Sequence, residues 1–151
     1  MNQSMQTLID LAKKRCDEAA QRLGSVMAQA RESEYKCGTL AAYRDDYRVR
    51  LDNAVRAGVE GADLRNFQGF LFKLDDAVRQ QSAELAHWQQ TVETARQLWQ
   101  AEQKRMRSYG VILDRRVDAE RIQTARRDQK AQDEIASRRS SLSGAHLALG
   151  H

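Results

Sequence analysis

Residues 57–63 read Ala-Gly-Val-Glu-Gly-Ala-Asp, and this short stretch decides the fold. Gly58 and Gly61 can adopt the left-handed backbone conformations that end helices and form turns, and Asp63 can cap a following helix. We therefore predict a turn at 58–62, with one helix from about 4 to 57 and a second from about 63 to 140. Because a short connection leaves two long helices side by side, they should be antiparallel.

Each segment that flanks the turn carries a stripe of mostly apolar residues, spaced alternately by three and four. An average spacing of 3.5 keeps one narrow face of a helix toward one neighbouring helix. The first stripe is Ile9, Ala12, Cys16, Ala19, Leu23, Val26, Ala30, Ser33, Cys37, Leu40, Arg44, Tyr47 and Leu51. The second stripe is Phe67, Leu71, Leu74, Val78, Gln81, Leu85, Trp88, Val92, Ala95, Trp99, Glu102, Met106, Tyr109 and Leu113. The sequence thus predicts an all-α fold, a long two-helix antiparallel coiled-coil hairpin.

The two stripes also predict how the helices align. If the numbers of paired positions sum to 118, the symmetry centre falls at residue 59, inside the turn, and every position of the first stripe meets one of the second. Trp88 then faces Ala30, and Trp99 faces Ala19. Such pairing of large with small residues fills a packed seam, and a shift by one heptad would lose it.

The second helix should outlast the first. In this register Met5 meets Leu113, and residues from 114 onward have no partner. The positions that would continue the second stripe are Arg116, Glu120, Gln123 and Arg127. We expect 114 to about 140 to form a charged overhanging helix and 141–151 a frayed tail, all within one elongated domain of residues 1–151.

Composition agrees with long helices. The 151 residues include no proline, which would cost about 3 kcal/mol inside a helix, and only 6% are aromatic, which leaves little for a second packed layer. The net charge of +4 arises after residue 99, because residues 1–99 hold 14 basic and 14 acidic residues and residues 100–151 hold 11 and 7. No apolar run is long enough to span a membrane, and no secretory signal is recognisable.

The cysteines do not predict a disulfide within the chain. Cys16 and Cys37 lie 21 residues apart on the first stripe, about 31 Å along one helix, which is far beyond the reach of a disulfide. They fit small apolar positions of the seam, with an intermolecular bridge as the alternative. Reducing cytosol suits both.

No pattern of catalytic residues is present. The sequence lacks a Gly-rich phosphate loop, a nucleophile elbow and a cluster of metal-ligating residues. Two adjacent carboxylate pairs, Asp45-Asp46 and Asp75-Asp76, would lie on solvated helix faces without a cleft. We predict no enzymatic activity, no metal or cofactor site and no small-molecule substrate.

Two surfaces are left over from the seam. Near the turn, Phe70, Phe72 and Ala77 lie off or at the edge of the second stripe, and Phe70, Leu74, Ala77 and Gln81 form a line at helical spacing. Either Phe70 thickens the apolar end of the hairpin, or this line binds a partner. The overhang is rich in arginine, which suits phosphates, but its acidic residues are interleaved, which is typical of a solvated or protein-binding helix.

Polar as well as apolar positions resemble the FliJ family of flagellar type III export proteins. The resemblance extends over nearly the whole chain, and heptad periodicity alone would not produce its polar matches. The matching segments are Thr7-Leu8-Ile9-Asp10-Leu11-Ala12, Asp17, Ala19-Ala20, Leu23-Gly24, Tyr43, Tyr47-Arg48, Leu51, Phe67-Gln68-Gly69-Phe70, Leu74, Ala77, Trp88, Arg127-Asp128-Gln129-Lys130, Asp133-Glu134 and Ala136.

The resemblance implies a cytoplasmic coiled coil, similar to the stalk of F-type ATPases, that binds in the pore of the hexameric flagellar export ATPase. It also implies contacts with the cytoplasmic domain of the export-gate membrane protein and with export chaperones. The protein would lie peripherally at the inner face of the cell membrane, at the flagellar base, and serve flagellum assembly, motility and chemotaxis.

The resemblance also implies two sets of site residues. The gate-binding residues would be Phe70, Leu74, Ala77 and Gln81, with glutamine at a position where the family's pattern has histidine. The ATPase-facing residues would be Arg127, Asp128, Lys130, Asp133 and Glu134. Two alternatives stay open, namely the equivalent stalk of a virulence type III injectisome and a basic coiled coil that binds nucleic acid.

Overall fold

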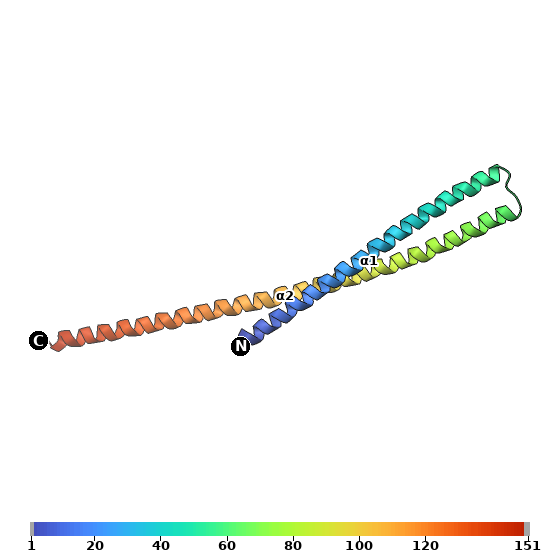
Figure 1. Ribbon diagram of the computed structural model, residues 1–151. Helices are drawn as coiled ribbons and strands as arrows, with labels where there is room; N and C mark the ends of the chain where they lie inside the picture. The colour runs from blue at the N-terminus through green and yellow to red at the C-terminus, as the bar shows by residue number, and fades with distance from the viewer. Residues whose placement is uncertain (1, 150–151) are drawn as a thin grey trace. The chain divides into compact units, whose positions relative to one another are not determined.

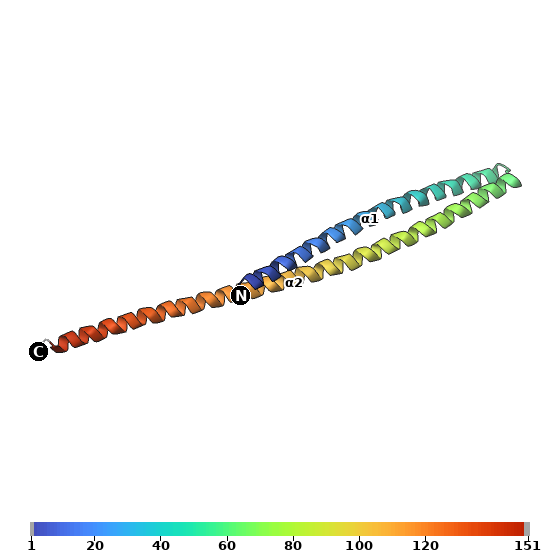
Figure 2. The ribbon, with the colours of Figure 1, turned by 60° about the horizontal axis from the view of Figure 1, so that its bottom comes forward.

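The computed structural model consists of two long helices. It describes residues 2–149, and the side chains of residues 3–144. Helix α1 spans Asn2–Arg56 and helix α2 spans Ala62–Leu149, and the described residues contain no strand. Within residues 11–105 the two helices run away from the turn side by side (Figures 1 and 2). The predicted all-α helical hairpin is confirmed.

The turn between the helices is built by hydrogen bonds at the end of α1. The N–H of Gly58 donates to the carbonyl of Val55 at 3.1 Å, and the N–H of Val59 donates to the carbonyl of Ala54 at 3.0 Å. This pair of bonds is a Schellman motif, and it requires a left-handed residue at Gly58, whose φ is +93°. Val59 and Ala54 are both half-buried, so the apolar contact that accompanies this motif is available.

The start of α2 differs from the predicted cap. The carbonyl of Gly61, which has a φ of +71°, accepts the N–H of Arg65 at 3.1 Å, so Gly61 stands at the cap position. Asp63 lies inside the first turn of α2. There its carboxylate still favours the helix, because the amino end of a helix carries partial positive charge.

The helices are longer than their sequence patterns predict. Helix α1 begins at Asn2, and α2 continues to Leu149 where a frayed tail from 141 is expected. Residues 145–149 read Ala-His-Leu-Ala-Leu, and alanine and leucine are strong helix formers, so a helix is favoured there once Gly144 is passed. Residues 150 and 151 of the predicted tail lie outside the described residues.

The described residues form two compact units, which we treat separately. One unit is Leu11–Arg105, and the other comprises the described residues of Met1–Asp10 and Met106–His151. No helix in the described part of the chain has an apolar stretch long enough to cross a membrane.

In the unit Leu11–Arg105, burial follows the two stripes. Every stripe position in this unit is buried or half-buried, and Val26 is the most completely buried large side chain, with 1% exposed. The buried positions are Ala12, Cys16, Ala19, Val26, Ser33, Leu51, Leu74, Val78 and Ala95. Both cysteines are free thiols. The predicted seam is therefore the core of this unit.

Contacts across the seam have the predicted register. They join positions whose numbers sum to between 114 and 123, on both sides of 118. The contacts are Ser33 with Gln81, Cys37 with Ser82, Arg44 and Arg48 with Asp75, and Tyr47 with Phe67 and Phe70. A slide by one heptad would centre the sums on 111 or 125, so the register of 118 is confirmed.

Glu102 is the weak point of the second stripe. Its side chain is only 14% exposed, and its Oε1 lies 3.6 Å from a guanidinium nitrogen of Arg105. Its Oε2 is buried without a hydrogen-bond partner. Because an unsatisfied buried oxygen is costly, this layer contributes less to stability than its neighbours.

In the second unit, burial stops at Leu113. Met5 and Ile9 of α1 and Met106, Tyr109 and Leu113 of α2 are half-buried. From residue 114 to residue 144 every side chain is exposed. We call residues 114–149 of α2 the overhang; it is drawn in orange to red in Figure 1.

Two glycines test the backbone argument with the same added methyl group. A Cβ at Gly38 would meet no atom within 4 Å and the site is helical, so Gly38→Ala should raise the free energy of unfolding by about 1 kcal/mol. Gly58→Ala should lower it by about 1 to 2 kcal/mol, because alanine is strained at a left-handed φ. Urea unfolding followed by circular dichroism measures both. Equal changes in the two variants would contradict the assigned turn.

A designed disulfide tests the register. In a chain whose Cys16 and Cys37 are replaced by alanine, Leu23→Cys with Ala95→Cys should form an intramolecular disulfide on oxidation, visible as altered mobility on a non-reducing gel. The matched control is Leu23→Cys with Glu102→Cys, which lies one heptad away, about 10 Å along the helix and beyond disulfide reach. Crosslinking of the control in preference to the first pair would refute the register.

Candidate protein-interaction surfaces

The line Phe70, Leu74, Ala77 and Gln81 lies on α2 in the unit Leu11–Arg105. Leu74 and Gln81 belong to the seam, and Phe70 and Ala77 lie beside it. Its four members differ in exposure. Phe70 is 42% exposed and Leu74 is 7% exposed, while Ala77 and Gln81 are half-buried. The line therefore runs from the surface into the seam, and Phe70 is its large accessible apolar side chain.

Phe70 belongs to an aromatic cluster near the turn, which consists of Tyr47, Phe67 and Phe70. The ring of Tyr47 meets the ring of Phe70 edge-on, with centroids 4.8 Å apart, and lies 5.7 Å from the ring of Phe67. A hollow beside this cluster is lined by Tyr47, Val59, Asp63, Asn66, Phe67 and Phe70. The cluster holds Phe70 in place, and a recess with both apolar and polar lining lies next to it.

Gln81 is already engaged within the seam. Its Nε2 donates a hydrogen bond of 3.1 Å to Oγ of Ser33, which is only 4% exposed. The bond satisfies a buried hydroxyl, and leaving that hydroxyl unpaired would be costly. Gln81 thus has a structural role that spacing alone did not reveal.

Next to Gln81 lies an apolar hollow on the other helix. Tyr35 is 76% exposed and Tyr43 is 48% exposed, both on α1. The hollow is lined by Tyr35, Lys36, Thr39, Leu40, Tyr43 and Gln81. Stripe spacing does not predict this surface. Its signal in the sequence is two tyrosines eight residues apart, both outside the stripe.

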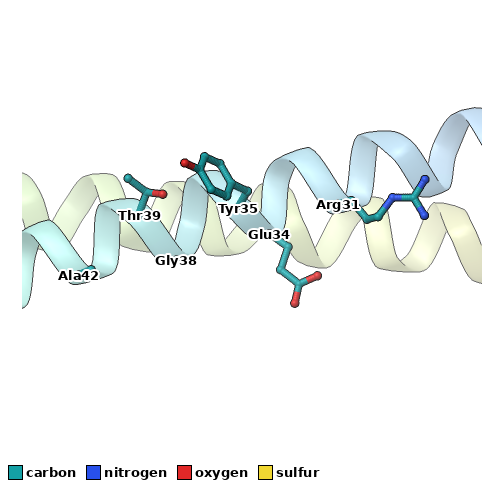
Figure 3. Close-up of a pocket in the computed structure, with 6 residues that line it drawn as sticks. All are labelled: Arg31, Glu34, Tyr35, Gly38, Thr39 and Ala42. Atoms are coloured by element: carbon teal, nitrogen blue, oxygen red, sulfur yellow. The ribbon is translucent and has the colours of Figure 1, made fainter.

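A third hollow is lined by residues of α1 alone. Figure 3 shows it around Gly38, where the missing side chain leaves a gap between Tyr35 and Ala42. Arg31, Glu34 and Thr39 complete its lining, and all six residues come from the same helix. Because one helix face cannot enclose a ligand, this hollow is a shallow feature of the surface.

The four carboxylates of the adjacent acidic pairs are each bound by arginine. Asp75 is the most sheltered of them, and it lies 3.3 Å from Arg48 and 3.7 Å from Arg44 across the seam. The other three pair with a residue of their own helix, Asp45 with Arg44, Asp46 with Arg50 and Asp76 with Arg79. These carboxylates serve ion pairs, and Asp75 joins the two helices. Within the described residues, no group of three or more His, Cys, Asp or Glu could hold a metal ion.

The overhang offers a charged surface with both signs. The five residues expected to face an ATPase, Arg127, Asp128, Lys130, Asp133 and Glu134, are all exposed. Gln129 donates a hydrogen bond of 3.2 Å to Asp133, and Arg121 lies 3.0 Å from Asp118. These contacts stay within one helix and leave the charged groups accessible from outside.

The sequence is similar to known flagellar proteins over almost its full length. A family model described as the flagellar FliJ protein matches residues 1–145. A Flagellar FliJ protein of Salmonella typhi is 31% identical over 135 residues, which are 89% of this chain and 92% of that protein. A Flagellar FliJ protein of Escherichia coli (strain K12) is 30% identical over the same length and coverage. The family match includes residues 70–81 and residues 127–134.

The bond between Gln81 and Ser33 generates a stability prediction. Gln81→Ala should lower the free energy of unfolding by about 1 to 3 kcal/mol, since it orphans a buried hydroxyl. The control is Gln80→Ala, which removes an exposed bond to Asp76 and should change stability by less than about 0.5 kcal/mol. Urea unfolding measures both variants. If they are equally stable, the bond is not formed in solution.

Proposed function

Because the chain belongs to the flagellar FliJ protein family, and is on that ground a component of the flagellar export apparatus, we propose a stalk-like role for it. The protein binds within the ring of the export ATPase, links this ring to the export gate at the membrane, and escorts export chaperones. It catalyses no reaction itself. It acts in the cytoplasm, at the inner face of the membrane.

The single observation that carries this proposal is the overhang. All side chains from 114 to 144 are exposed, so this part of α2 has a surface available on every side. A lone helix is about 10–12 Å across, which suits insertion into the narrow pore of a ring. Its interleaved charges permit many weak contacts with ring subunits, because exposed ion pairs each contribute little.

The aromatic cluster near the turn supports a separate gate contact. Aromatic side chains that a partner can bury often dominate the binding energy of protein interfaces. Phe70, which is 42% exposed and lies beside a recess, supplies such a side chain. Leu74, Ala77 and Gln81 continue the same line, with Leu74 and Gln81 acting mainly by holding the helix that presents it.

Family membership favours flagellar partners over those of a virulence injectisome. Nucleic acid is the less suitable partner for the overhang, because Asp128, Asp133 and Glu134 would meet the phosphate backbone together with the arginines.

Two full-length variants test the proposed division of roles. In the first, alanine replaces Arg127, Asp128, Lys130, Asp133 and Glu134. Alanine preserves the helix, so the variant should fold normally but no longer stimulate ATP hydrolysis by the cognate export ATPase. In the second, Phe70→Ala, stimulation should be kept, while affinity for the cytoplasmic domain of the export gate falls at least about tenfold, which corresponds to about 1.4 kcal/mol.

The two assays are run on both variants, with circular dichroism as the check on folding. Phe72→Ala serves as the matched control for Phe70, since Phe72 is 69% exposed and lies outside the line. If either variant loses both activities equally, the division between the two surfaces is wrong.

A further inference from the structure

The overhang carries a further heptad stripe with a changed phase, which we call the overhang stripe. After Leu113 the next steps, to Val117 and Arg121, are both four residues, and three and four alternate again from there. Because the step from Tyr109 to Leu113 is also four, this run contains two extra steps of four; each is a stutter, and together they rotate the apolar face of the helix to a new side. The apolar or small members of this overhang stripe are Val117, Thr124, Ala131, Ile135 and Leu142, and its charged members are Arg121, Asp128 and Arg138.

No described residue covers the overhang stripe. Val117 is 47% exposed, Ile135 is 51% exposed and Leu142 is 71% exposed. Ile122, which is 53% exposed, points to the opposite side of the same helix, since it lies 13 residues before Ile135. Exposed apolar side chains that recur at heptad spacing indicate a helix that pairs with another helix.

We propose that the overhang stripe pairs with the overhang stripe of a second copy of this chain. The two overhangs lie antiparallel around a two-fold axis, and the numbers of paired positions sum to 259. Leu142 then meets Val117 of the second copy, and Ile135 meets Thr124 of the second copy. The two-fold axis repeats each layer, as in any interface between identical surfaces.

Charge complementarity selects this occupant and this register. In an antiparallel pair, residues just before one set of seam positions face each other, and so do residues just after the other set. The numbers of these flanking pairs therefore sum to 261 or 257 instead of 259. Arg127 lies opposite Glu134 of the second copy on one side of the seam. Asp118 lies opposite Arg139 of the second copy on the other side. Because the axis doubles each pair, the arrangement contains four pairs of opposite charge at these flanking positions.

Other alignments of two copies bring like charges together. A shift by one heptad in one direction sets Glu134 opposite Glu134 of the second copy. A shift in the other direction sets Arg127 opposite Arg127 of the second copy. Parallel pairing places Arg121, Asp128 and Arg138 each against the same residue of the second copy. The antiparallel register with sums of 259 has two kinds of layer that place charged residues in the seam, Arg121 with Arg138 and Asp128 with Ala131.

These layers keep the association reversible. Arginine can extend its guanidinium from a seam toward solvent, and Arg121 already lies 3.0 Å from Asp118. Exposed ion pairs are screened by salt, so the pairing should weaken as ionic strength rises. Pairing also covers Arg127 and Glu134. The inference goes beyond the proposed function and does not depend on it.

Sedimentation velocity of the full chain, over a range of concentrations and in reducing buffer, tests the proposal. The wild-type chain should pass from monomer to dimer as concentration rises, with weaker association at high salt. Ile135→Glu should weaken association at least tenfold, and the matched control Ile122→Glu should leave it unchanged. A monomer at every concentration, or a dimer that Ile135→Glu leaves intact, would overturn the proposal.

Charge reversal tests the register independently. Arg127→Glu alone and Glu134→Arg alone each place two like-charged pairs across the seam and should abolish the dimer. The double variant restores opposite charges and should restore the dimer. Because both positions are exposed, helix content by circular dichroism should be the same in all variants. A double variant that stays monomeric would refute the antiparallel register.

Discussion

The seam between α1 and α2 is the contact on which the hairpin depends. In the unit Leu11–Arg105 two helices bury one narrow stripe each, and no third layer adds to it. Apolar area removed from water is the main favourable term in folding. The stability of this unit therefore rests on the buried Val26, Leu51, Leu74 and Val78, on small buried seam residues, and on half-buried large ones such as Trp88 and Trp99. Each polar layer in the seam is therefore costly unless its hydrogen bonds are made.

The seam meets this demand unevenly. Ser33 and Gln81 lie on opposite helices and satisfy each other with one bond, so a polar layer costs little there. Glu102 has no such partner across the seam, and one of its carboxylate oxygens is left unpaired. The same stripe thus contains a well-matched polar layer near the middle of the hairpin and a poorly matched one toward its open end, which predicts that the open end separates more easily.

Much of the fold follows from the sequence because one-dimensional spacing carries it. The two stripes determine which faces are buried, and the glycines of the turn determine which positions meet. Spacing does not predict the contacts of Asp75 with Arg44 and Arg48, because the long arginine side chains reach beyond their own layer of the seam. Gly61 takes the cap position in place of Asp63 because of local backbone geometry. The length of α2 depends on small differences in helix propensity, which the stripe does not report.

The candidate surfaces were predictable to a smaller degree. Phe70 could be identified as an apolar residue outside the stripe, but only the structure reveals that Tyr47 braces it and that Gln81 is committed to Ser33. Stripe spacing does not identify the pair Tyr35 and Tyr43, because both lie outside the stripe, although together they line one hollow. Spacing indicates which residues leave the seam, whereas exposure and contact indicate which of these are free to bind.

A hairpin held by one seam necessarily leaves most of its surface to partners. Where both helices run together, the stripe is covered and only side chains outside it can bind. Where α2 continues past the half-buried Leu113, the stripe changes phase and every described side chain is exposed. The register of the hairpin therefore sets the length of the overhang, since it fixes the residue at which α1 ends beside α2. The turn glycines, by fixing that register, determine how much of α2 is available to other molecules.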